Sequence, residues 1–187
     1  MNFYVGYDYR EDIAFNVCKY SLLKRHKEAE VFKLDVKVLK DSGIYRRDVD
    51  PLSSTEFTFT RFLVPYLSCF KGWVVFCDCD FLWLSDPEEL KSYFDINKAV
   101  VVVKHDYKPT SKLKMDGKTQ HLYPRKNWSS LILWNCSHSA NRCLTPNLIN
   151  KESGQFFHRF QWLDDHLIGE LPYHWNWLVD WYKEPQD

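Results

Sequence analysis

The sequence predicts an α/β protein with a mostly parallel, doubly wound sheet that has a mixed edge and helices on its faces. Short apolar runs typical of buried strands alternate along the chain with segments of helical spacing, and this alternation is characteristic of such sheets. A length of 187 residues suits one domain, which we expect to cover 1–187. The chain stops at WYKEPQD without a clear ending signal, so this domain can be the N-terminal part of a longer protein.

Apolar periodicity and turn residues indicate where the elements lie. The expected strands are 2–6, 31–35, 73–77, 99–103 and 131–134. The expected helices are 11–26, 55–70, 85–94, 139–150 and 155–170. Of these, 55–70 is ambiguous, because FTFTRF also alternates like a strand. The polar segments 36–53 and 104–126 are expected to be loops, and the lysine-rich second one is either a lid over substrate or a plain solvated loop.

The composition argues against several functional classes. The 25 basic and 25 acidic residues give a formal net charge of zero, which speaks against a dedicated nucleic-acid-binding protein. No run approaches the roughly 20 apolar residues of a membrane-spanning helix. The N-terminal MNFYVGYDYRED lacks the features of a secretion signal, so we expect a soluble, cytoplasmic protein. The six cysteines are then expected to remain thiols, with Cys77 and Cys79 buried rather than bound to metal.

The most informative stretch is VVFCDCDFLW, in which Asp78 and Asp80 interrupt an apolar run. Burying two carboxylates without a partner is costly, so their charge needs compensation. Ligands bind beyond the carboxyl ends of the strands in open α/β sheets, and two carboxylates there suit Mg²⁺ or Mn²⁺ completed by substrate phosphates and water. The stretch therefore suggests metal-assisted chemistry on a phosphorylated substrate, with two solvated turn carboxylates as the alternative.

The longer segment WVVFCDCDFLWLSDPEEL resembles the hallmark of nucleotide-sugar glycosyltransferases of the GT-A fold, particularly the family 8-like group. Further segments resemble that family in the same order: FYVGYD, STEFTFTRFLVPYL, NWSSLILWN and FQWLDDHLIGELPYHWN. The resemblance spans nearly the whole chain and extends to capsid-glycosylating enzymes of large algal viruses, for which the location would be the host cytoplasm. It implies a UDP-sugar donor, UDP-glucose by family frequency, a glycan or glycoprotein acceptor, and Mn²⁺ or Mg²⁺.

The resemblance also implies roles for individual residues. Asp80 would bind the metal directly, and Asp78 would contact the ribose, or the metal through water. Tyr7 and Asp8 would border the uracil, unless they only form the turn that ends the first strand. Arg61 would anchor the nucleotide or its diphosphate, unless it is a surface helix residue with a snorkelling stem.

Two features depart from the family pattern. Ser129 and Ser130 stand where the family has Ser-Gly in a strand that contributes to the nucleotide-sugar site. The C-terminal His-Pro-Trp motif that often supplies a third metal ligand is absent. His174 is the nearest candidate, although packing in an aromatic cluster is the simpler role for it.

The resemblance places the catalytic base in Asp164-Asp165. A carboxylate within reach can take the proton of an acceptor hydroxyl, and Asp165 is the predicted base, with Asp164 oriented toward the donor sugar. Retaining family 8 enzymes commonly have glutamine at the Asp165 position, so the aspartate favours inversion. The pair can also simply be an acidic helix start.

The tryptophans near this pair can form an acceptor platform or part of the core, because aromatic faces serve both purposes. They are Trp162, Trp175, Trp177 and Trp181.

Two alternatives come from other functional classes. A non-catalytic carbohydrate-binding or inactive transferase-like domain would account for the eight tryptophans and the missing third ligand. A haloacid-dehalogenase-like phosphatase also has an apolar strand that ends in Asp-x-Asp, but there the motif usually lies near the start of the domain. Turnover of a sugar nucleotide distinguishes the enzyme from the binding module.

Overall fold

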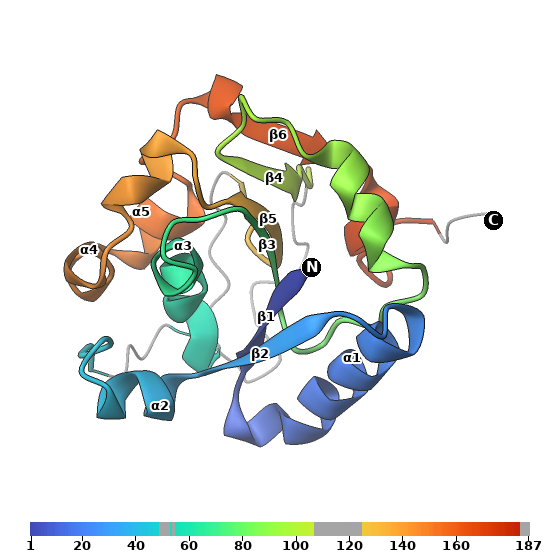
Figure 1. Cartoon of the computed structure of the whole chain (residues 1–187), viewed down its shortest axis with the longest axis horizontal. Helices are drawn as coiled ribbons and strands as arrows, with labels where there is room; N and C mark the ends of the chain where they lie inside the picture. Colours follow the sequence, from blue (N-terminus) through green and yellow to red (C-terminus); the bar gives the residue numbers. More distant parts are fainter. Residues whose placement is uncertain (49–52, 54, 107–124, 184–187) are drawn as a thin grey trace.

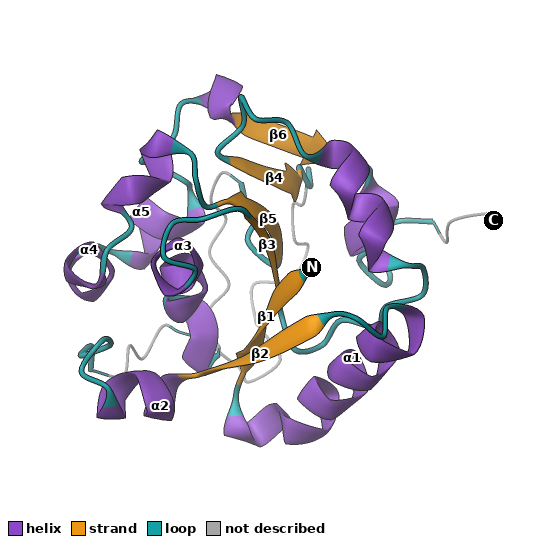
Figure 2. Cartoon of the chain, viewed as in Figure 1, coloured by secondary structure: helices purple, strands orange, loops and turns teal. Residues whose placement is uncertain are grey.

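A computed structural model describes residues 1–48, 53, 55–106 and 125–183. Its centre is a six-stranded sheet in the order β2-β1-β3-β5-β4-β6, seen as a continuous band between two sets of helices in Figure 2. The strands are β1 (Asn2–Tyr7), β2 (Glu30–Asp35), β3 (Trp73–Cys77), β4 (Val100–Val103), β5 (Leu131–Asn135) and β6 (Ile168–Leu171). The predicted α/β class is confirmed.

The sheet is mixed in its interior rather than at an edge. β1 pairs in parallel with β2 and β3, and β4 pairs in parallel with β6. The strand between these two groups, β5, runs antiparallel to both β3 and β4. The expectation of a mixed edge was therefore wrong, because an apolar run such as LILW carries no information about strand direction. One consequence is that the start of β5 lies at the same edge of the sheet as the ends of the other five strands.

Helices cover both faces of this sheet. Figure 1 shows α3, α4 and α5 on one side of the strands, and α1 with the green segment around residue 90 on the other. The α-helices are α1 (Asp12–Arg25), α2 (Val36–Asp41), α3 (Val64–Leu67), α4 (Pro146–Lys151) and α5 (Gly154–His158). The 3-10 helices are Tyr9–Glu11, Glu56–Thr58, Thr60–Leu63, Pro87–Tyr93, Ser139–Cys143, Asp165–Leu167 and Tyr173–Asn176. Among the described residues, no helix has the length and apolar content to cross a membrane.

Several elements differ from the sequence prediction. The expected helices 55–70 and 139–150 are each divided into 3-10 turns and a short α-helix, and 85–94 contains a 3-10 helix. The segment expected to be a loop contains α2, whose first turn is capped by the Asp35 carboxylate through the Lys37 N–H at 2.9 Å. The stretch expected to be helical to residue 170 breaks up after α5 and ends in β6. In both places tertiary packing overrides weak local periodicity: β6 has four residues and gains its stability from pairing with β4.

The core is aromatic on the side of α3 and α5. Phe62 is fully buried and stacks on Phe157 at a ring-centroid distance of 5.1 Å. Trp134 of β5 and Trp162 stack beside it with centroids 6.3 Å apart. Trp162 is thus a core residue, which is the packing role the sequence left open for it. On the other face, α1 buries Phe15, while its Ile13 is 82% exposed.

Candidate active site

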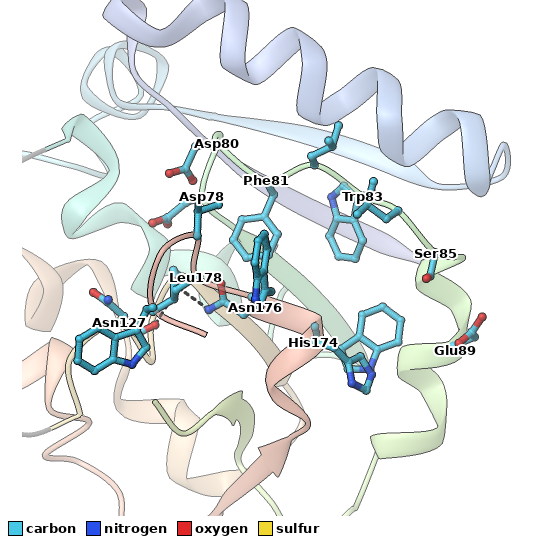
Figure 3. A pocket seen from close by; sticks show the side chains of 17 residues that line it. Asp78, Asp80, Phe81, Trp83, Ser85, Glu89, Asn127, His174, Asn176 and Leu178 are labelled. Carbon is cyan, nitrogen blue, oxygen red and sulfur yellow. Dashed lines mark hydrogen bonds between the residues drawn. The ribbon is translucent and has the colours of Figure 1, made fainter. Parts of the chain in front are cut away.

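Asp78 and Asp80 follow the end of β3, where the buried strand gives way to a turn. Figure 3 shows their carboxylates pointing to the same side. Both line a cavity of about 810 Å³ that is also bounded by residues just before β5 and after β6. The backbone of Asp78 is still hydrogen-bonded to the neighbouring chain segment, since its N–H donates to the carbonyl of Ser130 at 2.9 Å. The predicted position of the pair, at the carboxyl end of a buried strand, is confirmed.

Arg61 compensates one of the two charges. Its guanidinium is buried, and Nη1 lies 2.7 Å from Asp78 Oδ1. The same nitrogen donates to the carbonyl of Ser129 at 2.8 Å, and Nε donates to the carbonyl of Phe57 at 3.3 Å. The surface-residue alternative for Arg61 is therefore wrong. Arg61 holds Asp78 in place, and its contact with a nucleotide stays a prediction.

The electrostatic balance at the strand end remains negative. The pKa of Asp78 is raised to about 7, chiefly by burial and also by the nearby Asp80 and Glu11 carboxylates, while Arg61 acts to lower it. Glu11 accepts a hydrogen bond from the Cys79 thiol at 3.1 Å. Three carboxylates therefore lie near one guanidinium, and the two that line the cavity, Asp78 and Asp80, favour an additional cation there.

The aspartate pair fits a hard divalent ion held by few protein ligands. Asp78 Oδ1 is buried against Arg61 Nη1 at 2.7 Å, and the Asp78 side chain is still 21% exposed, so part of this carboxylate remains open to a ligand in the cavity. Asp80 is exposed at the cavity. The described residues contain no group of three His, Cys, Asp or Glu side chains suited to a metal. Figure 3 shows His174 apart from the pair, and its ring centroid lies 5.8 Å from that of Trp175. Such an ion would need phosphate and water as further ligands.

A buried polar network that sequence reasoning missed connects to the cavity through two lining residues, Asn176 and Ser130. Asn176 donates from Nδ2 to the Ser130 hydroxyl at 2.7 Å, dashed in Figure 3. The same nitrogen lies 2.9 Å from His105 Nε2, and His105 Nδ1 lies 2.9 Å from the Tyr182 hydroxyl. Burial lowers the pKa of His105 to about 4, so the ring is neutral and its Nε2 can accept. His105 lies two residues after the end of β4, so the strand-end rule could have identified it.

Tyr7 and Asp8 lie at the same sheet edge but outside the cavity lining. Asp8 is fully buried and accepts hydrogen bonds from the Arg10 backbone and side chain at 2.6–3.0 Å. Although burial acts to raise its pKa, these hydrogen bonds and one from the Glu56 N–H lower it. The Tyr7 hydroxyl donates to Asp12 Oδ1 at 2.9 Å. The strand-ending turn is thus present, and contact with uracil stays a prediction.

Ser129 and Ser130 take different positions just before β5. Ser130 lines the cavity and donates to the Asn127 carbonyl at 2.8 Å. Ser129 is buried, with its hydroxyl 2.8 Å from His158 Nδ1. Leu131 pairs with Cys77, so both serines lie at the edge where the aspartates are. Of the two, only Ser130 is placed to meet a ligand in this cavity.

Asp164 and Asp165 are not brought to this edge. β6 begins at Ile168, which pairs with Val100 at the start of β4. Val100 also pairs with Trp134 of β5, and Trp134 pairs with Val74 near the start of β3. The starts of β3, β4 and β6 therefore lie at the same edge of the sheet. Asp165, three residues before Ile168, therefore lies near the opposite edge of the sheet from Asp78. Its side chain is 90% exposed and forms an ion pair with Arg125. The structure does not place the predicted base beside the aspartate pair.

The remaining predicted features separate into two groups. Trp175, Trp177 and Trp181 line the cavity, as an acceptor platform requires. The greater part of the predicted lid, 107–124, lies outside the described residues. Cys77 and Cys79 are buried thiols as expected, and all six cysteines are free.

Comparisons with known proteins identify the fold and the family. No family model matches the chain. The chain is 48% identical over 176 residues to Protein CDI of Arabidopsis thaliana, covering 94% of this chain and 68% of that protein. The glycosyltransferase GlyE of Streptococcus pneumoniae TIGR4 superposes with a TM-score of 0.59 at 15% identity, covering 94% of this chain and 46% of GlyE.

Two other structures show the same likeness. The bifunctional glycosyltransferase WbbM gives a TM-score of 0.61 at 15% identity, over 92% of this chain and 39% of WbbM. The galactosyltransferase LgtC gives a TM-score of 0.51 at 12% identity, over 92% of this chain and 74% of LgtC. The chain thus spans less than half the length of GlyE and WbbM. It has the GT-A fold and belongs to the same family as Protein CDI of Arabidopsis thaliana.

Proposed function

We propose that this protein is a metal-dependent glycosyltransferase that moves a sugar from a UDP-sugar to a hydroxyl of a glycan acceptor. The observation that carries the proposal is the Asp78–Asp80 pair, which opens into a cavity of about 810 Å³ at the carboxyl end of β3 in a GT-A fold. The names of GlyE, WbbM and LgtC support sugar transfer as the class of reaction. UDP-glucose is the first donor to test and Mn²⁺ the first metal, with Mg²⁺ second. Membership of the family 8-like group belongs to the same proposal.

Each cavity residue has a defined task in this reaction. Bound at Asp80 and Asp78, the divalent ion would neutralise the diphosphate leaving group. Arg61 fixes Asp78 through its 2.7 Å ion pair, so the carboxylate cannot rotate away from the cavity. Asn176 orients the Ser130 hydroxyl. The tryptophan-lined wall excludes water, which would otherwise compete with the acceptor.

The transfer itself is a displacement at the anomeric carbon of the donor sugar. The acceptor oxygen forms a new bond to this carbon, the bond from the carbon to the diphosphate oxygen breaks, and UDP leaves with the bonding electron pair. The acceptor hydroxyl gives up its proton to a base. Asp165 is the base predicted from sequence, and inversion was predicted from the same residue. Its position near the opposite edge gives neither prediction support, so proton NMR of the product's anomeric signal is the direct test of stereochemistry.

Calorimetric titration with UDP and UDP-glucose, each with Mn²⁺ and with EDTA, tests the proposed class. We expect binding that requires the metal and is lost in Asp80→Ala. Asp41→Ala, an exposed aspartate at the end of α2, is the matched control and should bind like wild type. Equal UDP affinity of Asp80→Ala and wild type in Mn²⁺ would remove the metal assignment.

One specific observation favours a second candidate, a carbohydrate-binding domain without turnover. The described residues offer the metal only two carboxylates and no third protein ligand. Release of UDP from UDP-glucose in the presence of Mn²⁺ separates the two, since a binding domain turns over nothing. The phosphatase alternative has no further support, because the chain has the GT-A fold.

A further inference from the structure

Beyond the aspartate pair, one wall of the cavity is aliphatic and exposed. After Asp80, residues 81–84 belong to no helix or strand, and exposed and buried side chains alternate along 82–84. Trp83 points inward and is only 4% exposed, packing edge-on against Phe3 at 5.6 Å. Leu82 and Leu84 on either side are 58% and 71% exposed and line the cavity. The buried Trp83 thus fixes this segment to the core, while Leu82 and Leu84 on either side of it line the cavity.

The C-terminal segment supplies apolar side chains to the same cavity. Val179 is 70% exposed and Trp181 is 36% exposed, and both line it together with Leu178. Figure 3 shows Leu178 on the side of the cavity away from Trp83. Exposed large apolar side chains gathered in one cavity mark a binding site more reliably than the same residues scattered over a surface. Their position next to the aspartate pair makes the apolar wall continuous with the proposed reaction centre.

We propose that the acceptor is amphipathic: its hydroxyl is carried on a molecule with an alkyl or aryl group, and this group packs on the wall of Leu82, Leu84 and Val179. The proposal rests on the proposed function and specifies its acceptor. A purely polar glycan would stack on the tryptophans but would leave these aliphatic side chains in water, with no hydrogen bond offered in return. A volume of about 810 Å³ suits a small ligand. In the transfer, the hydroxyl oxygen of this molecule forms the new glycosidic bond, and its apolar group is unchanged.

Glycosides that share a sugar and differ only in the aglycone test this proposal. Methyl, octyl and phenyl β-D-glucopyranoside are titrated calorimetrically into the whole chain, with the octyl compound below its critical micelle concentration. Each fully buried methylene is worth about a fourfold gain. Three to four buried methylenes therefore predict that octyl glucoside binds about 100-fold more tightly than methyl glucoside. Tighter binding of the octyl or of the phenyl compound shows whether the wall prefers an alkyl or an aryl group.

Two variants link such binding to the wall. The double variant Leu84→Ser, Val179→Ser should weaken octyl glucoside binding about tenfold. Val38→Ser is the matched control, because Val38 is 63% exposed on α2 and does not line the cavity. Equal affinity for methyl, octyl and phenyl glucoside overturns the proposal, as does octyl binding that the double variant leaves unchanged. Wild-type titration with UDP and Mn²⁺ is scored separately: if UDP binds and the glycosides do not differ, only the acceptor inference fails. If UDP does not bind, the proposed function fails.

Discussion

Arg61 is the residue whose removal tests the architecture of the site most directly. It is 5% exposed and provides the nearest cation to Asp78, at 2.7 Å. Removing one partner of a buried ion pair costs about 3–5 kcal/mol, because the remaining charge stays buried without compensation. We therefore expect Arg61→Met to lower the free energy of unfolding by about that amount at pH 8.

The double variant Arg61→Met, Asp78→Asn separates the ion pair from the other contacts of Arg61. It removes the uncompensated charge but still lacks the two hydrogen bonds to the Ser129 and Phe57 carbonyls. At about 1 kcal/mol for each lost bond, it should be about 2 kcal/mol less stable than wild type, and so more stable than Arg61→Met alone. Urea denaturation followed by tryptophan fluorescence measures all four corners of this cycle.

The pKa of Asp78 determines how the coupling between Arg61 and Asp78 changes with pH. The pKa of Asp78 in the folded state, about 7, lies above its ordinary value of 3.8. Between these values the folded state binds the proton more tightly, so the stability from this group is present at low pH and is lost as pH rises through about 7. The coupling between Arg61 and Asp78 should therefore be larger at pH 8 than at pH 5. A coupling below about 0.5 kcal/mol at pH 8 would refute the view that Arg61 compensates Asp78.

Three further outcomes are expected. The pKa of His105 is lowered to about 4 by burial, so the unfolded state binds more protons between pH 6.5 and 4, and stability is lost as pH falls through this window. In His105→Gln, the loss of unfolding free energy between pH 6.5 and 4 should be smaller by up to about 3 kcal/mol, as measured by urea titrations. An unchanged dependence of the unfolding free energy on pH would contradict this expectation. Asp165→Asn should keep metal-dependent UDP binding, since its side chain lies outside the cavity lining; an unchanged transfer rate would remove it as the base. In the native protein only Cys69 and Cys143 should react rapidly with Ellman's reagent, because the other four thiols are buried, and all six should react in urea.

The strands and the aspartate pair could be predicted from sequence because their signals are local. An apolar run such as AVVVV needs burial on both faces wherever it lies, and two carboxylates inside another run need a compensating cation. α2 was missed because its six residues follow no clear period and depend on the Asp35 cap. The role of Asp165 was inferred from a motif, and a motif contains no information about which sheet edge the following strand begins at.

By itself, the sequence determined the α/β class, the existence of β1 and β3, and the pair Asp78–Asp80 at a strand end. Only the tertiary structure decided that Arg61 turns inward to pair with Asp78, that buried His105 contacts Asn176 of the cavity lining, and that Asp165 lies near the other edge. It also decided that Leu82 and Leu84 stay exposed while Trp83 is buried. The physical reason is that hydrophobic patterning fixes which segments must be covered, whereas strand order and direction fix which strand ends meet.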